Sequence, residues 1–141
     1  MIEPTKTSIW LKNPYTRPVI AGTFNPSINR SERFMAHTIE VAILNPVEGK
    51  TRAQQIARLK EWKKHFLTMG AEKVVVKESG PGNIDGAWIF EIHHKSTAAY
   101  GAAIDSYYKS PKSHDEIMVK WQKTPTLSFT GYSLFIEVDE I

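Results

Sequence analysis

The alternation of apolar and polar residues along the chain predicts four β-strands. From Phe34 to Ile43 the side chains alternate with a period of two, and Asn45 and Pro46 end the run. Three further runs, each rich in branched or aromatic residues, predict strands at 72–79, 87–94 and 127–140. The glycine-rich segment 80–86, GPGNIDG, separates the second and third strands and predicts a hairpin turn.

Helical spacing of apolar residues predicts a first helix between the first two strands. Thr51 and Gln54 form a capping box at its start, and Gly70 offers a cap at its end. The apolar stripe that should face the core consists of Ile56, Leu59, Trp62, Phe66 and Met69. This segment carries the strongest helix signal in the chain, because the stripe and both caps agree.

Two more helices are predicted between the third and fourth strands. The second helix starts at a cap on Ser96 or Thr97 and is interrupted at Pro111. A short third helix starts at a capping box formed by Ser113 and Glu116. The residues of these two helices expected in the core are Tyr100, Ile104, Tyr107, Tyr108, Ile117, Met118 and Trp121.

The order of these elements predicts an α+β fold of the ferredoxin-like βαββαβ type. In this plan four antiparallel strands form one sheet, and the helices pack on one of its faces. The fold is assigned to residues 34–141 as one domain. Residues 1–33 are predicted to form an extended, proline-rich N-terminal arm, because Pro18 and Pro26 exclude a central strand or a helix there. The alternative is a loosely attached extension or a truncated neighbouring domain.

A sheet covered by helices on one face leaves the other face open, and alternation assigns residues to the two faces. The more uniformly apolar set is expected under the helices and comprises Ile39, Val41, Ile43, Trp88, Phe90, Ile92, Leu134, Ile136 and Val138. The set expected on the open face comprises Phe34, Ala36, Thr38, Glu40, Ala42, Ala87, Ile89, Glu91, His93, Phe129, Ser133, Phe135 and Glu137. Because the large apolar members need cover, a homodimer through the open face is expected.

Composition narrows the function classes. The 141 residues are 41% hydrophobic and 23% charged, as in an ordinary globular domain, and contain no cysteine, which excludes disulfides and thiolate metal sites. No membrane span or signal peptide is recognised, so a cytoplasmic location is expected. Nucleic acid is not an expected partner, because the net charge is only +3 and segment 85–92, DGAWIFEI, lacks the basic and stacking residues of an RNA-recognition strand.

The adjacent histidines His93 and His94 are the candidates for chemistry. Neighbouring strand residues point to opposite faces, so the two cannot bind one metal while the strand stays regular. His93 is expected on the open face with Glu91 and Glu40, where a carboxylate could fix the imidazole tautomer for general acid–base catalysis. His94 is expected to hold the strand end to a loop or helix terminus. The alternative for the three candidate catalytic residues is a polar barrel mouth or an intersubunit salt bridge.

The remaining candidates describe a binding surface without a metal or cofactor. The predicted substrate-binding residues are Phe34, Thr38, Ile89, Ser133, Phe135 and Glu137. His37 is assigned to the opposite face from His93, and no recognised metal-ligand spacing occurs, so no metal site is predicted. No cofactor is expected.

The element order, the third strand GAWIFEI, the helix STAAYGAAIDSYYKSP and the long final strand together resemble the dimeric α+β barrel superfamily, which includes antibiotic-biosynthesis monooxygenase-like proteins. The resemblance covers residues from about Phe34 to Ile141 and matches no diagnostic catalytic motif. It implies two sheets packed face to face in a homodimer, with a ligand cavity between them. Family activities range from cofactor-free oxygenation and haem degradation to isomerisation and no known catalysis.

Two hypotheses of different class follow. In the first, the protein is a cofactor-free enzyme, monooxygenase-like or isomerase-like, that binds a small apolar or aromatic metabolite in the barrel. In the second, it is a non-catalytic dimeric module for ligand binding or structure. An enclosed pocket bearing His93, Glu91 and Glu40 favours the first hypothesis, whereas a space filled by side chains favours the second.

Overall fold

The computed structural model describes residues 35–82, 86–109, 111–138 and 141. Its elements, in chain order, are β1 (Thr38–Pro46), α4 (Arg52–Thr68), β2 (Lys73–Glu78), β3 (Trp88–His94), α5 (Thr97–Lys109), α6 (Pro111–Lys123) and β4 (Leu127–Ile136). The predicted N-terminal arm, residues 1–33, and Phe34 lie outside the described residues.

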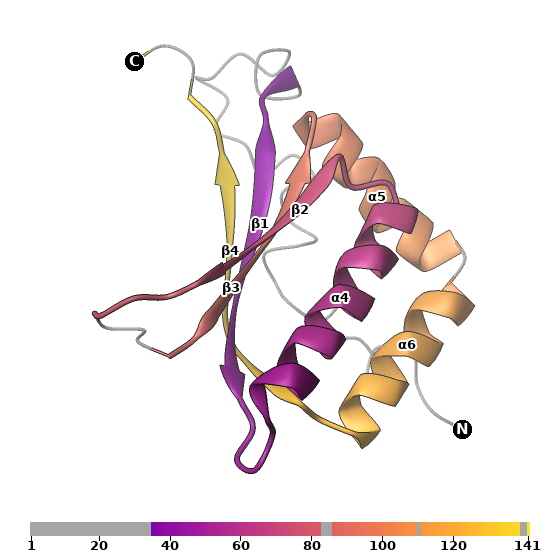
Figure 1. Ribbon diagram of the computed structural model, residues 1–141. Helices are drawn as coiled ribbons and strands as arrows, with labels where there is room; N and C mark the ends of the chain where they lie inside the picture. Colours follow the sequence, from indigo (N-terminus) through magenta and orange to yellow (C-terminus); the bar gives the residue numbers. More distant parts are fainter. Residues whose placement is uncertain (1–34, 83–85, 110, 139–140) are drawn as a thin grey trace.

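The four strands form one antiparallel sheet in the order β2-β3-β1-β4. Figure 1 shows α4, α5 and α6 on the same side of this sheet. With the chain order β1-α4-β2-β3-α5-α6-β4, this is the predicted ferredoxin-like α+β plan. The two central strands, β1 and β3, therefore carry the residues nearest the middle of both faces.

The residues predicted to cap α4 and α5 do so in the structure. At the start of α4 the Thr51 hydroxyl accepts a hydrogen bond from the Gln54 amide at 3.2 Å, and the Gln54 side chain accepts one from the Thr51 amide at 2.9 Å. Gly70 adopts a φ of 105° after the helix, a conformation that costs a glycine little. The Ser96 hydroxyl caps α5 by accepting a hydrogen bond from the Ala99 amide.

The predicted cap at Ser113 is wrong. α6 begins at Pro111, so Ser113 lies within the helix and not before it. A proline suits the first turn of a helix, because its missing N–H would have no partner there and its fixed φ already matches the helix. The residues of α6 predicted to turn inward do so: Met118 and Trp121 are buried, and Ile117 packs against the core.

The core between the sheet and the helices is rich in aromatic side chains. Phe66 of α4, Phe90 of β3, and Tyr100 and Tyr107 of α5 are almost completely buried. Phe66 meets Phe90 edge to face at 5.9 Å between ring centroids, a geometry that aromatic pairs prefer. Tyr108, which was also expected in the core, is 40% exposed, so that prediction is wrong.

The predicted faces of the first strand are reversed in the structure. In β1 the residues Thr38, Glu40, Ala42 and Leu44 are buried under the helices, whereas Ile39, Val41 and Ile43 lie on the open face. The register explains why, because these even positions pair with His94, Ile92, Phe90 and Trp88, which face the helices as predicted. The polar members can be buried since each has a partner, as described below.

The last strand follows the prediction in part. Leu134 and Ile136 lie on the helix side, opposite Glu40 and Thr38. The register shifts between Ile43 and Leu44, and this irregularity brings Phe129 opposite Leu44, where it packs on the core and not on the predicted open face. The strand ends at Ile136, and Val138, which was expected under the helices, is 52% exposed.

Candidate functional site

The open face of the sheet has a continuous apolar part. Ile39 and Phe135 are paired across β1 and β4, and Ile43 and Ile89 are paired across β1 and β3. The Phe135 side chain is 55% exposed. Because the structure places the three large residues of β1 here, this face is more apolar than the sequence pattern predicted.

A hydrogen-bonded row of polar side chains crosses the same face. The Nε2 atom of His93 lies 2.8 Å from Glu91 Oε1, and Lys77 Nζ donates to the other oxygen of Glu91 at 2.7 Å. On the other side, His93 Nδ1 lies 2.9 Å from His37 Nε2. We call His37, His93, Glu91 and Lys77 the open-face row. It links β2, β3 and the residue before β1.

The charge on Glu91 fixes the proton positions in the open-face row. Burial by itself raises the pKa of Glu91, but hydrogen bonds from Lys77 and His93 outweigh it and hold the pKa below its usual range. Glu91 is therefore a carboxylate that accepts the Nε2 proton of His93. With one proton on each ring, His93 Nδ1 accepts the Nε2 proton of His37, and Nδ1 of His37 carries a lone pair.

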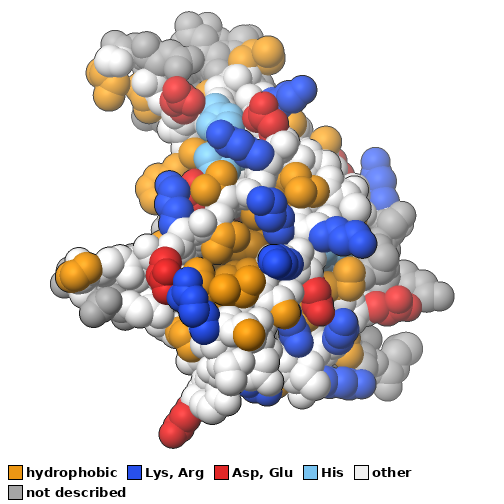
Figure 2. Space-filling view, in the orientation of Figure 1, with side chains coloured by type: hydrophobic (Ala, Val, Ile, Leu, Met, Phe, Trp, Pro, Cys, Tyr) orange, Lys and Arg blue, Asp and Glu red, His pale blue; other side chains and the backbone are white. Residues whose placement is uncertain are grey.

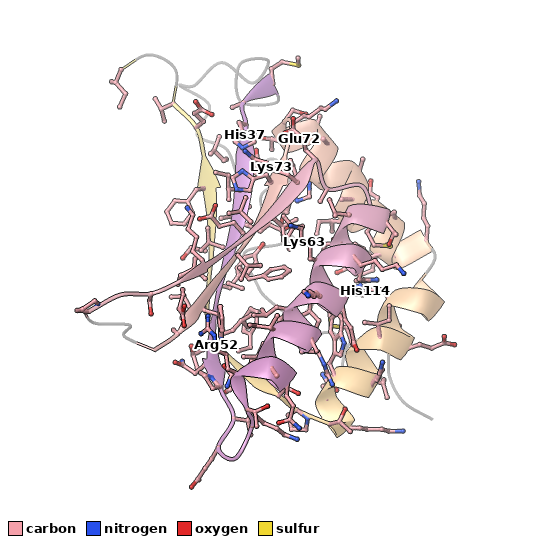
Figure 3. The ribbon with its side chains drawn as sticks, viewed as in Figure 1. His37, Arg52, Lys63, Glu72, Lys73 and His114 are labelled. Atoms are coloured by element: carbon pink, nitrogen blue, oxygen red, sulfur yellow. The ribbon has the colours of Figure 1, made fainter. Side chains whose placement is uncertain are left out.

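Glu72 lies near that lone pair. Its Oε2 atom is 3.8 Å from His37 Nδ1, and the His37 side chain is 26% exposed. Figure 3 shows His37, Glu72 and Lys73 together at one end of the sheet. A proton added to His37 Nδ1 would create an ion pair with Glu72, so the row can take up one proton without the rotation of either ring.

Glu40, the third predicted catalytic residue, is not part of this row. Its side chain is 1% exposed on the helix side, where Oε2 lies 2.7 Å from His94 Nε2 and Oε1 accepts a hydrogen bond from the Tyr132 hydroxyl at 2.7 Å. The prediction that Glu40 shares a face with His93 is therefore wrong. His94 does lie at the strand end, but it binds Glu40 and not a loop or helix terminus.

The cluster of Glu40, His94 and Tyr132, which we call the buried triad, is almost closed to solvent. Burial and the nearby charge of Glu40 raise the pKa of Tyr132 far above its usual range, so Tyr132 remains a hydrogen-bond donor. The same two causes raise the pKa of Tyr100. His94 Nδ1 is buried without a hydrogen-bond partner, so the contact of Nε2 with Glu40 orients the ring.

The predicted substrate-binding residues are divided between the two faces. Ile89, Ser133 and Phe135 lie on the open face, and Glu137 is exposed just after β4. Thr38 is instead completely buried on the helix side, where its hydroxyl lies 2.9 Å from that of Thr97. The predicted open-face position of Thr38 is wrong for the same reason as that of Glu40.

Sequence reasoning missed two histidine contacts. His37 was assigned to the face opposite His93, yet the two rings share a hydrogen bond, so that assignment is wrong. His65 of α4 lies 2.8 Å from His114 of α6, and His114 stacks on Tyr107 with ring centroids 4.5 Å apart. Burial, followed by the charge of His65, lowers the pKa of His114 to about 3. No local sequence motif predicts either contact.

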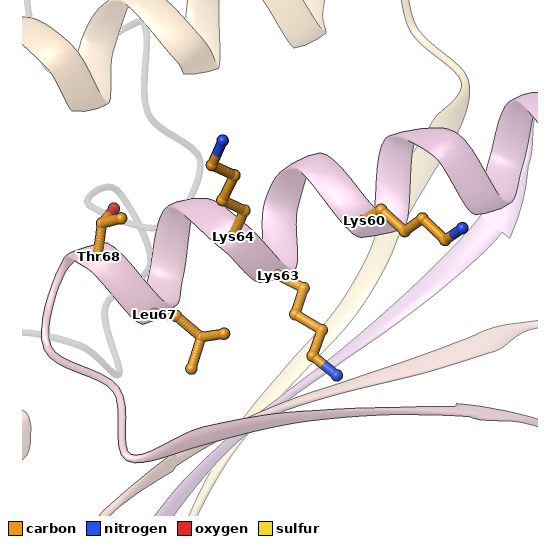
Figure 4. A pocket seen from close by; sticks show the side chains of 5 residues that line it. All are labelled: Lys60, Lys63, Lys64, Leu67 and Thr68. Carbon is orange, nitrogen blue, oxygen red and sulfur yellow. The ribbon is translucent and has the colours of Figure 1, made fainter.

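Other features of the described residues carry little chemistry. Among them no group of three or more histidines, aspartates or glutamates could hold a metal ion, and no helix is long and apolar enough to cross a membrane. Figure 2 shows lysine and arginine side chains around a hydrophobic hollow between the sheet and α4. A depression on α4 is lined only by side chains that leave one helix in different directions, namely Lys60, Lys63, Lys64, Leu67 and Thr68 (Figure 4).

The fold and this site define a ferredoxin-like α+β protein with a polar row on the open face of its sheet. A solved structure with the same fold is a dimeric ferredoxin-like protein from an uncultured marine organism, which matches with a TM-score of 0.52 and 14% sequence identity. The match covers 75% of this chain and 99% of that one. No protein-family model and no curated protein sequence matches the chain. The comparison therefore supports the fold.

Proposed function

We propose that two copies of the chain pair through the open faces of their sheets and enclose a site for a small apolar or aromatic metabolite. The apolar part of the face supports this, because the helices of the described part of the chain lie on the other side of the sheet from Ile39, Ile89 and Phe135. The ferredoxin-like protein of known structure is itself described as dimeric. Two identical faces related by a two-fold axis can cover each other, because the same surface is used on both copies.

The open-face row is the observation that carries the chemical half of the proposal. His93 uses both ring nitrogens within the row, so it passes or orients protons and does not meet the substrate itself. His37 presents the remaining lone pair at Nδ1 and is the proposed general base. Glu91, held as a carboxylate by Lys77, orients His93 and stabilises the charge that develops when His37 accepts a proton.

This arrangement suits the removal of a proton from a carbon beside a carbonyl or an aromatic ring. Isomerisation and cofactor-free oxygenation can both begin with that step, so the row fits either activity suggested by the family resemblance. The proton leaves the substrate carbon for His37 Nδ1, and in an isomerisation it returns from that nitrogen to a second carbon. A positioned general base of this kind contributes about 10²–10⁴-fold to a rate.

Light scattering on the full chain tests the dimer. The expected mass is twice the 16.0 kDa of one chain. Phe135→Lys should shift the protein towards the monomer, because it places a charge on the proposed interface. Leu67→Lys is the matched control, since Leu67 is 41% exposed on α4 on the other side of the sheet. A wild-type mass of one chain would refute the dimer.

Deuterium exchange tests the chemistry. The protein is incubated in D₂O with a panel of arylpyruvates and aryl ketones, and loss of the carbon-bound proton is followed by ¹H NMR. Exchange should fall at least a hundredfold in His37→Gln and by less in His93→Gln, while Glu116→Gln, an exposed change on α6, should leave it intact. Exchange that is equal in all variants would exclude the row as its source, and a dimer without any exchange would favour the non-catalytic module.

A further inference from the structure

A cavity on the helix side of the sheet lies apart from the open-face row. It has a volume of about 370 Å³ and opens between α4, α6 and the first residues of β4. Its walls include Trp62 of α4, Met118 and Trp121 of α6, and Leu127 and Phe129 of β4. We infer that this cavity is a second binding site, which takes a small, uncharged, aromatic molecule.

The walls favour an aromatic ring. Trp62 and Trp121 lie with ring centroids 4.7 Å apart and planes tilted by 42°, so they offer a ring both a face and an edge. Phe129 supplies a third aromatic wall, and the thioether of Met118 adds a polarizable contact. Aromatic pairs are stabilised beyond the area that they bury, so several such contacts select a ring over an aliphatic chain.

The residues that line the cavity disfavour a charged ligand. Among the described residues that line the cavity there is no aspartate, glutamate, lysine, arginine or histidine. The carboxylate nearest the indole of Trp121 belongs to Glu61, which accepts the Nε1 proton at 3.2 Å and lies within 4 Å of both Arg58 and Lys120. An ion in the cavity would therefore lose its hydration without gaining a free counter-charge. The exposed hydroxyl of Ser128 can bind one polar group of the ligand.

The cavity is also of a suitable size and is already formed. Ligand pockets usually measure about 300–1,000 Å³, so this one suits one or two fused rings. Trp62, Met118, Trp121 and Leu127 are each less than a tenth exposed, which means that core packing holds the walls before any ligand arrives. A pre-formed site loses little affinity to ordering on binding.

Fluorine NMR on the full chain labelled with 5-fluorotryptophan tests the inference, with 2-naphthol as the probe. The chain has four tryptophans, and single Trp→Phe variants assign their signals. Titration should shift the signals of Trp62 and Trp121 with saturation. The signal of Trp88, whose indole donates to Gln55 away from the cavity, should stay in place. No saturable shift, or equal shifts of all signals, would overturn the site.

A variant that blocks the cavity and a measured contact between the probe and Met118 complete the test. Ser128→Phe places a ring at the mouth of the cavity and should weaken 2-naphthol binding at least tenfold, while Ala57→Phe, an exposed change on α4, should not. In the wild-type protein, nuclear Overhauser effects should join the naphthol protons to the Met118 methyl group. Undiminished binding in Ser128→Phe, or contacts only to methyl groups other than those of Met118, Leu127 and Val47, which line the cavity, would refute the inference. The contact measurement stands even where the variant does not fold.

Discussion

Glu40→Leu is expected to destabilise the protein, although it replaces a buried charge with an apolar side chain. In the native fold the carboxylate accepts one hydrogen bond from His94 Nε2 and one from the Tyr132 hydroxyl, each at 2.7 Å. Leucine accepts neither. Both donors stay on the helix side of the sheet, and the His94 side chain has no exposed surface through which water could replace the carboxylate.

The size of the effect follows from the stranded His94 donor, because the Tyr132 hydroxyl keeps its hydrogen bond with Tyr100. A buried donor left without a partner costs about 1–3 kcal/mol, so the free energy of unfolding should fall by about that amount. A domain of this size has a free energy of unfolding of about 5–15 kcal/mol, so the loss is a measurable fraction of the total. The exposed substitution Glu48→Leu is the control and should change the free energy by less than about 0.5 kcal/mol.

A double-mutant cycle separates the buried triad from simple packing. His94→Leu alone leaves the buried Glu40 carboxylate with Tyr132 as its hydrogen-bond donor and should cost about 3–5 kcal/mol. The Glu40→Leu/His94→Leu protein removes the carboxylate and the imidazole together, so its loss should be smaller than the sum of the two single losses by about 2 kcal/mol or more. Urea denaturation, followed by tryptophan fluorescence and circular dichroism at one protein concentration, supplies the four values.

The reasoning fails on two clear results. If Glu40→Leu were as stable as the wild-type protein, the carboxylate would not be the acceptor that keeps His94 satisfied. If the two single losses added to within about 0.5 kcal/mol, the residues would act independently, and the 2.7 Å contact between them would carry no coupling.

Three further predictions concern the rest of the molecule. Thr51→Ala removes a hydroxyl that caps α4 and should lower the unfolding free energy by about 1 kcal/mol in urea titrations; an unchanged midpoint would contradict this. Burial lowers the pKa of His114 in the fold to about 3, against 6.5 in the unfolded chain. The unfolded chain therefore binds a proton first as the pH falls, and the free energy of unfolding should decline from about pH 6.5 towards pH 3 by up to about 1.4 kcal/mol per pH unit. His114→Phe should flatten that decline. Lys77→Met should raise the pKa of Glu91, measured by ¹³C NMR of the carboxyl group, because a hydrogen bond and a nearby positive charge are lost; a constant pKa would refute the contact.

The order and type of the elements could be read from the sequence because their signals are local. The capping box of Thr51 and Gln54 acts within one turn, and the stripe of α4 depends only on helical spacing. The third strand was also assigned to the correct face, since Trp88, Phe90 and Ile92 are too apolar to face water. Local chemistry therefore sufficed for the fold class.

The choice of which β1 residues face the helices could not be predicted in the same way. Alternation indicates that two sets of residues face opposite sides, but it selects the buried set only by apolar character. Here that criterion favours Ile39 and Val41 over Thr38 and Glu40. The structure buries the polar set because Thr97, His94 and Tyr132 provide partners, and these residues lie more than 50 positions away in the sequence. A pairing at that range leaves no local pattern.

This one reversal changes both halves of the candidate site. It removes Glu40 from the neighbourhood of His93 and brings in His37, which lies on the same side as Ile39, the register partner of His93. It also moves Ile39, Val41 and Ile43 to the open face, which therefore needs cover more than the sequence pattern suggested. A second copy of the same face would bury these residues and place the two open-face rows in one enclosed space. There His37 Nδ1 would act without competition from bulk water, with Glu72 as the nearest carboxylate and Glu91 at the other end of the row. The proposed dimer and the proposed proton transfer thus both depend on which residues of β1 face the helices.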